Sequence, residues 1–516
     1  MIPRFAFPGL AGDVARGFLG RGAVAVAPPP AADFVVASDA DWALIPASLW
    51  TNGGLIEVEP GTYNPGTIFQ NRSPSAPLIF RAKNPATQLI GAYWQRQPSA
   101  LAKSRIVNLR PLSSYNLQWH DFEITTTQWG GTTPACVLFS GQNGDLVFAR
   151  NWIHAGYDGN PDVPLDPLKN DYKEYACIVP TYNASGVVTA LTIQSAFIGN
   201  DVADGTYNLR FDSANGSVTY TTLPTGTFTV AGGNIVSTNL TGGGASNATL
   251  HTNNSLGILS KQIVWDAQPG LPAQRTMLGS LPWGFRGGSL TPNRNMTFDS
   301  NLLTDCGSAI KPTGLPTGAS STVLVTKNTF DRIYMDYFSM GYPANGNVQP
   351  RFILSWSFGT RPIAKGGDPG DPHIDFIQTF MNSNTSPWQD IQLFGNVFIN
   401  GNTRGVAQVY FISDAPLAPY HPYVVGNIGA ATVPQGLSIE RSRYGYFAHN
   451  TIVSWDGASG SAPQYAVLAA QEGSSISLNN LVHIVTFATG AQQHVNRGFG
   501  SDSIVPFSAA GLNAAF

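Results

Sequence analysis

An asparagine flanked by apolar residues recurs through this chain, and it constrains the fold more than any other feature. It occurs in FARNWIH (Asn151), FDSNLLT (Asn301), VTKNTFD (Asn328), LFGNVFI (Asn396), VVGNIGA (Asn427), AHNTIVS (Asn450) and LNNLVHI (Asn480). Three adjacent spacings are 27, 23 and 30 residues, which suits successive turns of a solenoid with variable loops. Asparagine alone is common in loops, but here its apolar neighbours recur as well. We therefore expect the side chains to stack at a strand bend, where they bond one another and the unpaired backbone.

Short strands separated by turns account for most of the remaining sequence. From about residue 34 onward, runs of Val, Ile, Leu, Phe and Tyr are bounded by Gly, Asn, Asp or Pro, which is the strand signal. Near the start, only residues 41–50 (DWALIPASLW) have a helical pattern. The sequence therefore predicts an all-β chain with one early helix.

The first strands carry a resemblance to a known fold. Residues 53–85, GGLIEVEPGTYNPGTIFQNRSPSAPLIFRAKNP, predict strands at 55–58 and 78–82 around the turn Pro60-Gly61. This segment resembles the opening turn of right-handed parallel β-helix proteins, especially the chondroitinase B and alginate lyase group. The resemblance implies a right-handed parallel β-helix that runs from about residue 34 to 500.

One segment interrupts the solenoid pattern. Residues 183–260 are almost uncharged and rich in Thr, Gly and Ser, with alternating strands at 206–211 and 217–221. This pattern predicts a small antiparallel β module inserted between solenoid turns. Its order of G-V-V-T-x-L-T-I, D-G-T-Y and G-G-x-A-S-N-A-T resembles modules of phage tail proteins. The resemblance implies a glycan-binding or trimer-contact role, and an elaborated loop with its own small core is the alternative.

The predicted organisation has five parts. They are an N-terminal attachment segment and linker (1–33), the first part of the β-helix (34–182), the inserted module (183–260), the second part of the β-helix with the glycan site (261–500), and a C-terminal cap or trimer contact (501–516). Asp13, Arg16 and Arg21 interrupt every apolar window at the N-terminus, so we expect no signal peptide there.

Composition excludes several classes of function. Charged residues make up 11% of the chain, hydrophobic residues 43%, and the net charge is −3. A nucleic-acid partner is not expected, because no basic run exceeds two residues. No apolar run has the 18 or more residues that a membrane-spanning helix needs, so membrane insertion is not expected. Cys136, Cys177 and Cys306 are too widely spaced for a metal site or a disulfide framework.

The main catalytic candidate is GGDPGDPHIDFIQ, residues 366–378. On a strand, His373 and Asp375 share one face, Asp371 lies on the loop before them, and Gln378 follows where the strand should bend. The run resembles a His-x-Asp-x-x-Gln element of pectate-lyase-like β-helix proteins. An imidazole beside carboxylates suits acid–base catalysis on a sugar, and the same oxygens suit Ca²⁺. A polar ladder that satisfies a strand bend is the structural alternative.

A second candidate is NTFDRIYMDYFSMGYP, residues 328–343. On a strand here, Tyr334 and Asp336 lie on one face with Phe338. If this strand lies one or two turns from the His373 strand, Asp336 and Asp375 can approach each other. Glycoside hydrolysis requires such a pair of carboxylates, about 5–10 Å apart.

Further binding residues are aromatic or cationic. Five tryptophans are predicted at strand ends or loops, where an indole ring could stack on a sugar face: Trp119, Trp129, Trp152, Trp356 and Trp388. Packing in the core is the alternative for each of them, and Trp356 is the one we name as a substrate-binding residue. Arg351 and Lys311 could neutralise a uronate carboxylate. Residues 438–450 (SIERSRYGYFAHN) concentrate charge around His449 and could bind an acidic sugar, although a solvated loop explains them as well.

No known enzyme's catalytic motif is present. The chain lacks the Trp-x-Asp-His element of pectate lyases and the Asn-Thr-Asp, Asp-Asp, Gly-His-Gly and Arg-Ile-Lys motifs of polygalacturonases. The resemblance therefore bears on fold and substrate class more than on the reaction.

Taken together, these patterns favour a phage tailspike- or tail-fibre-like protein that binds, and can depolymerise, a bacterial surface polysaccharide. The expected location is the virion tail or the extracellular space. The expected partners are the glycan, other virion proteins through the N-terminal segment, and two further copies in a homotrimer. A stand-alone extracellular polysaccharide lyase or glycoside hydrolase, and a non-enzymatic virion protein or adhesin, are the alternatives. Ca²⁺ is the only cofactor that these residues suggest, and no other cofactor is expected.

Overall fold

The fold was analysed in a computed structural model of the chain. It describes residues 31–91, 94–127, 135–156, 162, 178–182, 188–193, 205–211, 220–222, 225–232, 234–241, 244–245, 263–265, 275–276, 283–287, 294–311, 321–333, 337–340, 351–360, 374–379, 391–399, 407–412, 422–431, 437–439, 446–454, 476–478, 481–482, 492–494 and 497–498.

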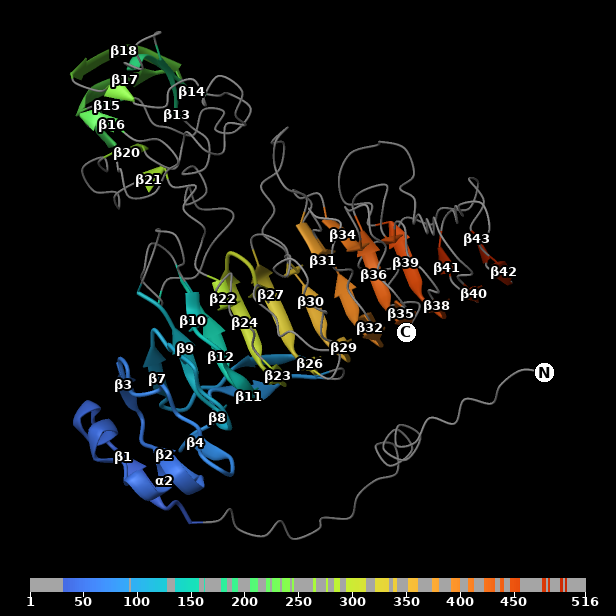
Figure 1. Ribbon diagram of the computed structural model, residues 1–516. Helices are drawn as coiled ribbons and strands as arrows, with labels where there is room; N and C mark the ends of the chain where they lie inside the picture. Colours follow the sequence, from blue (N-terminus) through green and yellow to red (C-terminus); the bar gives the residue numbers. More distant parts are fainter. Residues whose placement is uncertain are drawn as a thin grey trace.

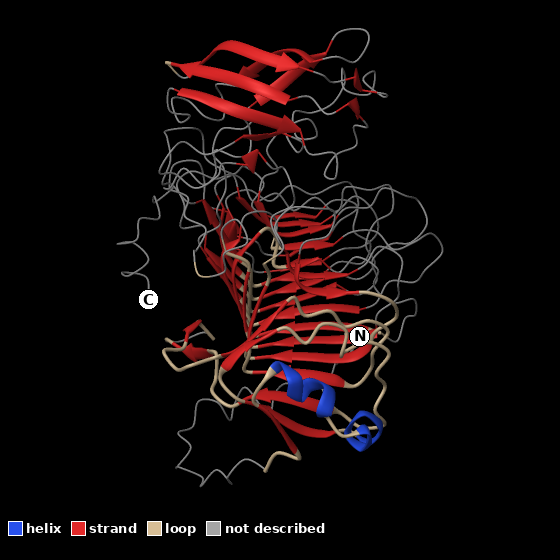
Figure 2. Cartoon of the chain, turned by 90° about the vertical axis from the view of Figure 1, so that its left-hand side faces the viewer, coloured by secondary structure: helices blue, strands red, loops and turns tan. Residues whose placement is uncertain are grey.

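Three long sheets of parallel strands form a solenoid (Figures 1 and 2). Sheet 1 has 13 strands: β1 (Phe34–Val36), β2 (Gly54–Val58), β4 (Leu78–Ala82), β8 (Leu117–His120), β11 (Gly144–Ala149), β23 (Arg294–Asp299), β26 (Thr322–Thr326), β29 (Arg351–Ser355), β32 (Ile391–Phe394), β35 (Tyr423–Val425), β38 (Tyr446–Ala448), β40 (Ile476–Leu478) and β42 (Gln492–His494).

Sheet 2 has 12 strands: β3 (Gly61–Tyr63), β7 (Ser104–Val107), β9 (Glu123–Thr125), β12 (Trp152–His154), β24 (Leu302–Cys306), β27 (Thr329–Ile333), β30 (Phe358–Thr360), β33 (Val397–Ile399), β36 (Ile428–Ala431), β39 (Thr451–Ser454), β41 (Leu481–Val482) and β43 (Arg497–Gly498). Sheet 3 has seven: β10 (Ala135–Phe139), β22 (Trp283–Gly287), β25 (Ile310–Lys311), β28 (Phe338–Met340), β31 (Ile374–Thr379), β34 (Ala407–Ile412) and β37 (Leu437–Ile439). Most turns of the solenoid visit sheets 1, 2 and 3 in that order, so the predicted parallel β-helix is confirmed.

Alternating burial along the strands builds the interior. In β4 the burial alternates from Leu78 to Ala82, which is the period of a strand with one face inside. Because the strands pair in register, equivalent inward residues of successive turns stack. Phe80, Trp119, Phe148 and Phe298 are such a column, with nearly parallel rings 6.1, 4.9 and 5.7 Å apart. Trp119 is fully buried in this column, so its predicted role as a sugar platform is wrong.

Two short helices lie at the first turns of the solenoid (Figure 2). The helical pattern at 41–50 corresponds to a 3₁₀ helix at Asp39–Leu44 and to α2 at Ala47–Asn52. Pro46 separates them, because the residue before a proline is biased away from the helical region. Trp42 of the first helix is buried and packs edge-on against Phe69.

Antiparallel strands interrupt the solenoid between β12 and β22, as predicted, but they extend from residue 178 to residue 276 and so beyond the predicted bounds of 183–260. They are β13 (Ile178–Tyr182), β14 (Val188–Ile193), β15 (Gly205–Phe211), β16 (Tyr220–Thr222), β17 (Thr225–Ala231), β18 (Asn234–Thr241), β19 (Gly244–Ala245), β20 (Ile263–Trp265) and β21 (Arg275–Thr276). They share no sheet with the solenoid, and Figure 1 shows them as a group apart.

The asparagine ladder forms at the corner where sheet 1 passes into sheet 2, which confirms the prediction for six of its seven members. Each carboxamide nitrogen donates to the next asparagine's Oδ1, at 3.1 and 3.0 Å in one run and 2.9 and 3.0 Å in another. The runs are Asn151, Asn301 and Asn328, then Asn396, Asn427 and Asn450. Ser357 connects them, since its Oγ accepts from the Asn328 N–H and its own N–H donates to Asn396 Oδ1. Asn480 lies outside the described residues.

Candidate functional site

The outside of this same corner carries the exposed side chains of greatest functional interest. The residue before each ladder position has a positive φ, between 52° and 67°, and so has Asp121 (69°), which precedes Phe122 at the same corner one turn before Asn151. These residues, hereafter the corner column, are Asp121, Arg150, Ser300, Lys327, Trp356, Gly395, Gly426 and His449. Successive members belong to successive turns of the solenoid, about 4.8 Å apart. The column therefore places functional groups in a line along one edge.

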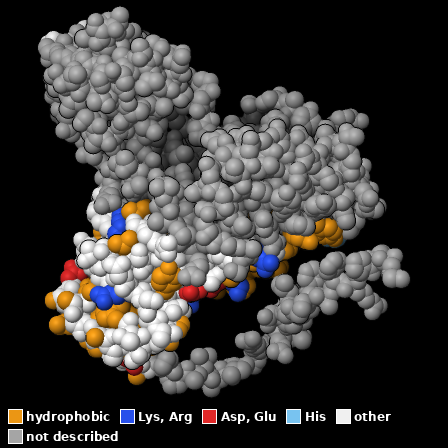
Figure 3. Space-filling view, viewed as in Figure 1, with side chains coloured by type: hydrophobic (Ala, Val, Ile, Leu, Met, Phe, Trp, Pro, Cys, Tyr) orange, Lys and Arg blue, Asp and Glu red, His pale blue; other side chains and the backbone are white. Residues whose placement is uncertain are grey.

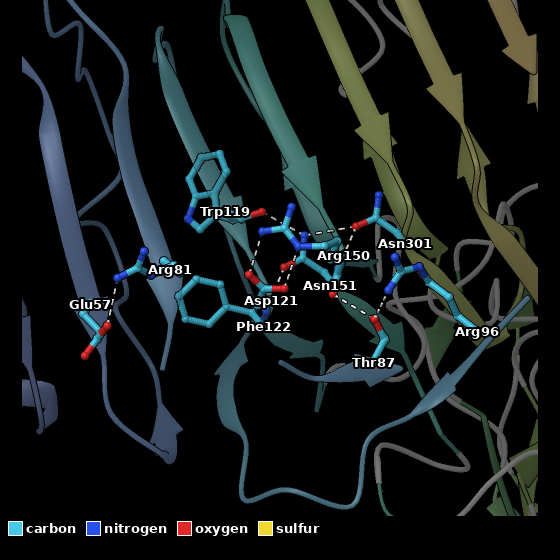
Figure 4. Close-up of polar contacts among 10 residues, drawn as sticks. All are labelled: Glu57, Arg81, Thr87, Arg96, Trp119, Asp121, Phe122, Arg150, Asn151 and Asn301. Atoms are coloured by element: carbon cyan, nitrogen blue, oxygen red, sulfur yellow. Dashed lines mark hydrogen bonds and ion pairs between the residues drawn. The ribbon is translucent and has the colours of Figure 1, made fainter. Parts of the chain in front are cut away.

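The first part of the corner column is an ion pair. Arg150 Nε and Nη2 donate to the two carboxylate oxygens of Asp121 at 2.8 and 2.7 Å (Figure 4). This bidentate hydrogen bonding raises the pKa of Arg150. Beside the pair, burial and, less strongly, the charge of Arg150 lower the pKa of His120 to about 4. His120 is therefore neutral at physiological pH, and its Nε2 has no hydrogen-bond partner in the described structure.

A hairpin from the early sequence crosses to the middle of the solenoid. Its strands are β5 (Thr87–Leu89) and β6 (Arg96–Pro98). Thr329 Oγ1 accepts from the Arg96 N–H at 3.0 Å and donates to the Trp94 carbonyl at 2.9 Å. These bonds hold Trp94 against the ammonium of Lys327, with Nζ 4.7 Å from the centroid of the indole ring. Trp94 is 39% exposed.

Trp356 occupies the next position of the corner column. It is 36% exposed, and its indole lies over the backbone of Gly395 on the following turn. A Cβ added to Gly395 would lie 2.7 Å from Cε3 and Cζ3 of the indole. A Cβ added to Gly426, one turn further, would meet no atom within 4 Å. The two glycines therefore leave a side-chain-free shelf in front of an exposed tryptophan.

A second polar cluster lies on sheet 2 and is buried. Glu123 accepts from Arg105 Nε at 2.8 Å and contacts His154 Nε2 at 2.9 Å. Burial by itself raises the pKa of Glu123, but the hydrogen bonds from His154 and Arg105 outweigh it and hold the pKa below its ordinary value. His154 is 1% and Glu123 2% exposed, so a substrate does not reach either side chain in this structure.

Sequence reasoning missed the Glu123 cluster, although a signal existed. Ile106, Ile124 and Ile153 all face the core, and their neighbours Arg105, Glu123 and His154 are therefore directed to the other face of three paired strands. The sequence shows the alternation of these residues, but it does not show which strands pair with one another. We assign this cluster a structural role, since it joins three turns of the solenoid.

The predicted site residues lie in different parts of the fold. Arg351 and Trp356 stand at opposite ends of one turn of sheet 1, about 16 Å apart for five residues of extended chain. Asp375 and Gln378 are on β31 of sheet 3. Because β31 continues to Thr379, the expectation that the strand bends at Gln378 is wrong. His373, Asp371, Asp336 and Tyr334 lie outside the described residues, as do Trp129 and Trp388.

The second catalytic candidate segment is divided between two sheets. Thr329–Ile333 is β27 of sheet 2, and Phe338–Met340 is β28 of sheet 3. A single strand through this segment was therefore a wrong prediction, because the chain turns a corner here. Tyr337 and Phe338 are both fully buried, as a strict alternation would not allow. However, β28 pairs directly with β31, with Phe338 opposite Ile377, so the two candidate segments do reach adjacent turns.

Charge is sparse on the described surface (Figure 3), and the described side chains contain no group of three or more His, Cys, Asp or Glu residues suited to a metal ion. Within the same residues, no helix has the length and hydropathy that crossing a bilayer requires.

Comparison with known proteins identifies no relative. No protein-family model matches the chain, and no curated protein matches its sequence.

Proposed function

We propose that the chain binds a bacterial surface polysaccharide, as a tailspike- or tail-fibre-like protein of a virion. The observation that carries this proposal is the exposed indole of Trp356 above the glycine shelf at 395 and 426. Tryptophan is usually buried in proteins, and an exposed indole beside open backbone is suited to stack on the apolar face of a pyranose.

The parallel β-helix fold supports this proposal. Its turns repeat about every 4.8 Å, so an extended polymer can lie along one edge and meet an equivalent position at each turn. The low charge of the chain favours a partner recognised by stacking and hydrogen bonding. The 13-stranded sheet 1 offers a long side on which three copies can pack, which supports the homotrimer in the same proposal.

Cleavage of the bound polysaccharide by residues of sheet 3 is the second part of the proposal. The strand that follows Asp336 pairs with the strand that carries Asp375. This pairing is what a carboxylate pair contributed by two adjacent turns requires. His373, two residues before Asp375, is the proposed acid–base partner.

The experiment is retention on an array of bacterial capsular and O-antigen polysaccharides, followed by incubation in solution with each retained glycan. Chain length is followed by size exclusion and new double bonds by absorbance near 235 nm. Trp356→Ala should weaken retention about tenfold. Leu44→Ala, at a 66% exposed residue of the first helix, is the control and should change retention less than twofold.

Each outcome separates the candidate functions. Shortened chains with new absorbance indicate a lyase, and shortened chains without it indicate a hydrolase. Retention without shortening supports a binding protein and overturns the catalytic part. Retention of no polysaccharide, or retention that Trp356→Ala leaves unchanged, overturns the proposed function.

A further inference from the structure

We propose that the corner column binds an acidic sugar, with Lys327 holding the acid group between the indoles of Trp94 and Trp356. This inference rests on the proposed function and assigns its ligand class and two further binding residues. Three observations carry it: the state of the Lys327 charge, the lack of carboxylates at the described corner positions beyond Lys327, and the hairpin that completes the site.

The charge of Lys327 is not neutralised by a described carboxylate. Its ammonium lies 4.7 Å from the Trp94 ring centroid, a cation–π contact, and no described Asp or Glu oxygen lies within 4.0 Å of it. Arg72 and Lys103 likewise lie over indoles, 4.3 and 5.4 Å from the ring centroids. Several other cations have carboxylate partners in the structure. Those pairs are Arg81–Glu57, Lys83–Glu59, Arg150–Asp121 and Arg332–Asp305.

The corner beyond Lys327 carries no acidic side chain in its described part. The corner column continues as Trp356, Gly395, Gly426 and His449. The strand ends beside these positions are also uncharged: Thr326, Ser355, Phe394, Val425 and Ala448. An acidic ligand that extends from Lys327 toward His449 therefore meets no like charge from these residues. By contrast, Asp121 lies earlier in the column, where Arg150 pairs with it.

The two tryptophans approach this cation from different parts of the chain. Trp356 follows Lys327 by one turn, since Thr326 pairs with Ser355 in sheet 1. Trp94 reaches the same place only because Thr329 Oγ1 bonds to both Arg96 and Trp94 of the hairpin. One indole on the ammonium and a second indole one turn further along the column offer two apolar faces to sugar rings and one charge to their acid group.

The shelf beyond Trp356 sets the direction of the ligand. Gly395 is covered by the indole, whereas nothing lies within 4 Å of a Cβ placed on Gly426. From Lys327 to Gly426 there are three turns of the solenoid, about 14 Å at strand spacing. A short stretch of an acidic polysaccharide therefore fits along the column, with its acidic residue at the Lys327 end.

The test uses the full chain and the same polysaccharide array, with each acidic glycan printed in its native form and in its carboxyl-reduced form. Wild-type protein should bind native acidic glycans at least about tenfold more tightly than the reduced ones, with a preference that weakens as salt rises. Lys327→Gln should remove most of that preference, Lys327→Arg should keep it, and Trp94→Ala should reduce it. Lys83→Gln, which removes a cation already paired with Glu59 at 2.7 Å, is the matched control and should leave it intact.

The outcomes distinguish this inference from the function on which it rests. Equal binding of native and reduced glycans that still depends on Trp356 overturns the acidic-sugar assignment and leaves the proposed function standing. A preference for acidic glycans that survives Lys327→Gln overturns the role of Lys327. Absence of any Trp356-dependent binding overturns the proposed function, and the inference with it. Circular dichroism and melting temperature of each variant show that a loss of binding is not a loss of fold.

Discussion

Replacing Gly395 by alanine should disable the corner column without unfolding the solenoid. The added Cβ would lie 2.7 Å from Cε3 and Cζ3 of Trp356, well inside the 3.5–4.0 Å of a normal carbon contact. The indole is 36% exposed and can move away, so we expect it to swing off the shelf. Loss of a stacked ring of this size corresponds to about 1.4 kcal/mol, or roughly a tenfold weaker Kd for the retained polysaccharide.

Gly426→Ala is the matched control because its backbone cost is the same. Gly395 has φ +59° and Gly426 φ +67°, and an alanine in this left-handed region costs about 1–2 kcal/mol at either position. Only Gly395 has Trp356 against it, since a Cβ on Gly426 meets no atom within 4 Å. We therefore expect similar melting temperatures for the two variants. The loss of affinity should be smaller for Gly426→Ala, because its methyl group lies on the shelf but leaves Trp356 in place.

The assay combines titration calorimetry with tryptophan fluorescence. Gly395→Ala should shift the emission of Trp356 because the indole leaves its contact, and adding Trp356→Ala to Gly395→Ala should weaken binding no further than Trp356→Ala alone. Equal losses of affinity in Gly395→Ala and Gly426→Ala would refute the reasoning, because backbone strain alone would then explain both.

Three further results are expected. Asn427→Ala should lower the free energy of unfolding by about 3–5 kcal/mol in urea titrations, because Asn427 Oδ1 accepts two hydrogen bonds from Asn396 and its Nδ2 donates to Leu393, Val425 and Asn450. Asn84→Ala, at a half-buried residue outside the ladder that donates to the Ala102 carbonyl, is the control, and an equal loss there would contradict the ladder. The folded-state pKa of His120 is about 4, below the ordinary value of 6.5, so stability is greatest above pH 6.5 and should fall by about 2–3 kcal/mol as the pH drops from 6.5 to 4. His120→Gln should flatten that part of the profile, and an unchanged slope would speak against this assignment. Asp375→Asn should abolish any glycan cleavage with little change in melting temperature, whereas a large loss of stability without a specific loss of cleavage would count against a catalytic role.

The recurring asparagine was enough to predict both the solenoid and the ladder. A buried asparagine at a strand bend must satisfy four hydrogen-bonding positions. The asparagines of the two adjoining turns and one backbone carbonyl satisfy them at Asn301, so the requirement leaves a periodic pattern in the sequence. The strands predicted at 55–58 and 78–82 are likewise present as β2 and β4, because their alternation is local. The helical pattern at 41–50 was predicted correctly, but the division into two helices at Pro46 was not predicted.

The site was much less predictable, because it depends on which turns stack on which. Trp356 was predicted as a candidate from its residue type, but neither Trp94 nor Lys327 was. Their contact depends on the hairpin that Thr329 fixes through Arg96, and 233 residues separate Arg96 from Thr329 in the sequence. Trp119 lies near the end of β8 and Trp356 directly follows β29, yet Trp119 is fully buried and Trp356 is 36% exposed. Strand pairing also shows that residues 329–340 turn from one sheet to another, which alternation alone did not indicate.

By itself, the sequence determined the architecture of this protein: strand periodicity, turn residues and the asparagine repeat are local properties, and together they specify a parallel solenoid with an antiparallel insertion. Only the tertiary structure decided which side chains become neighbours on its edge. Lys327 meets Trp94, and Trp356 covers Gly395, because stacking places successive turns about 4.8 Å apart whatever their separation along the chain.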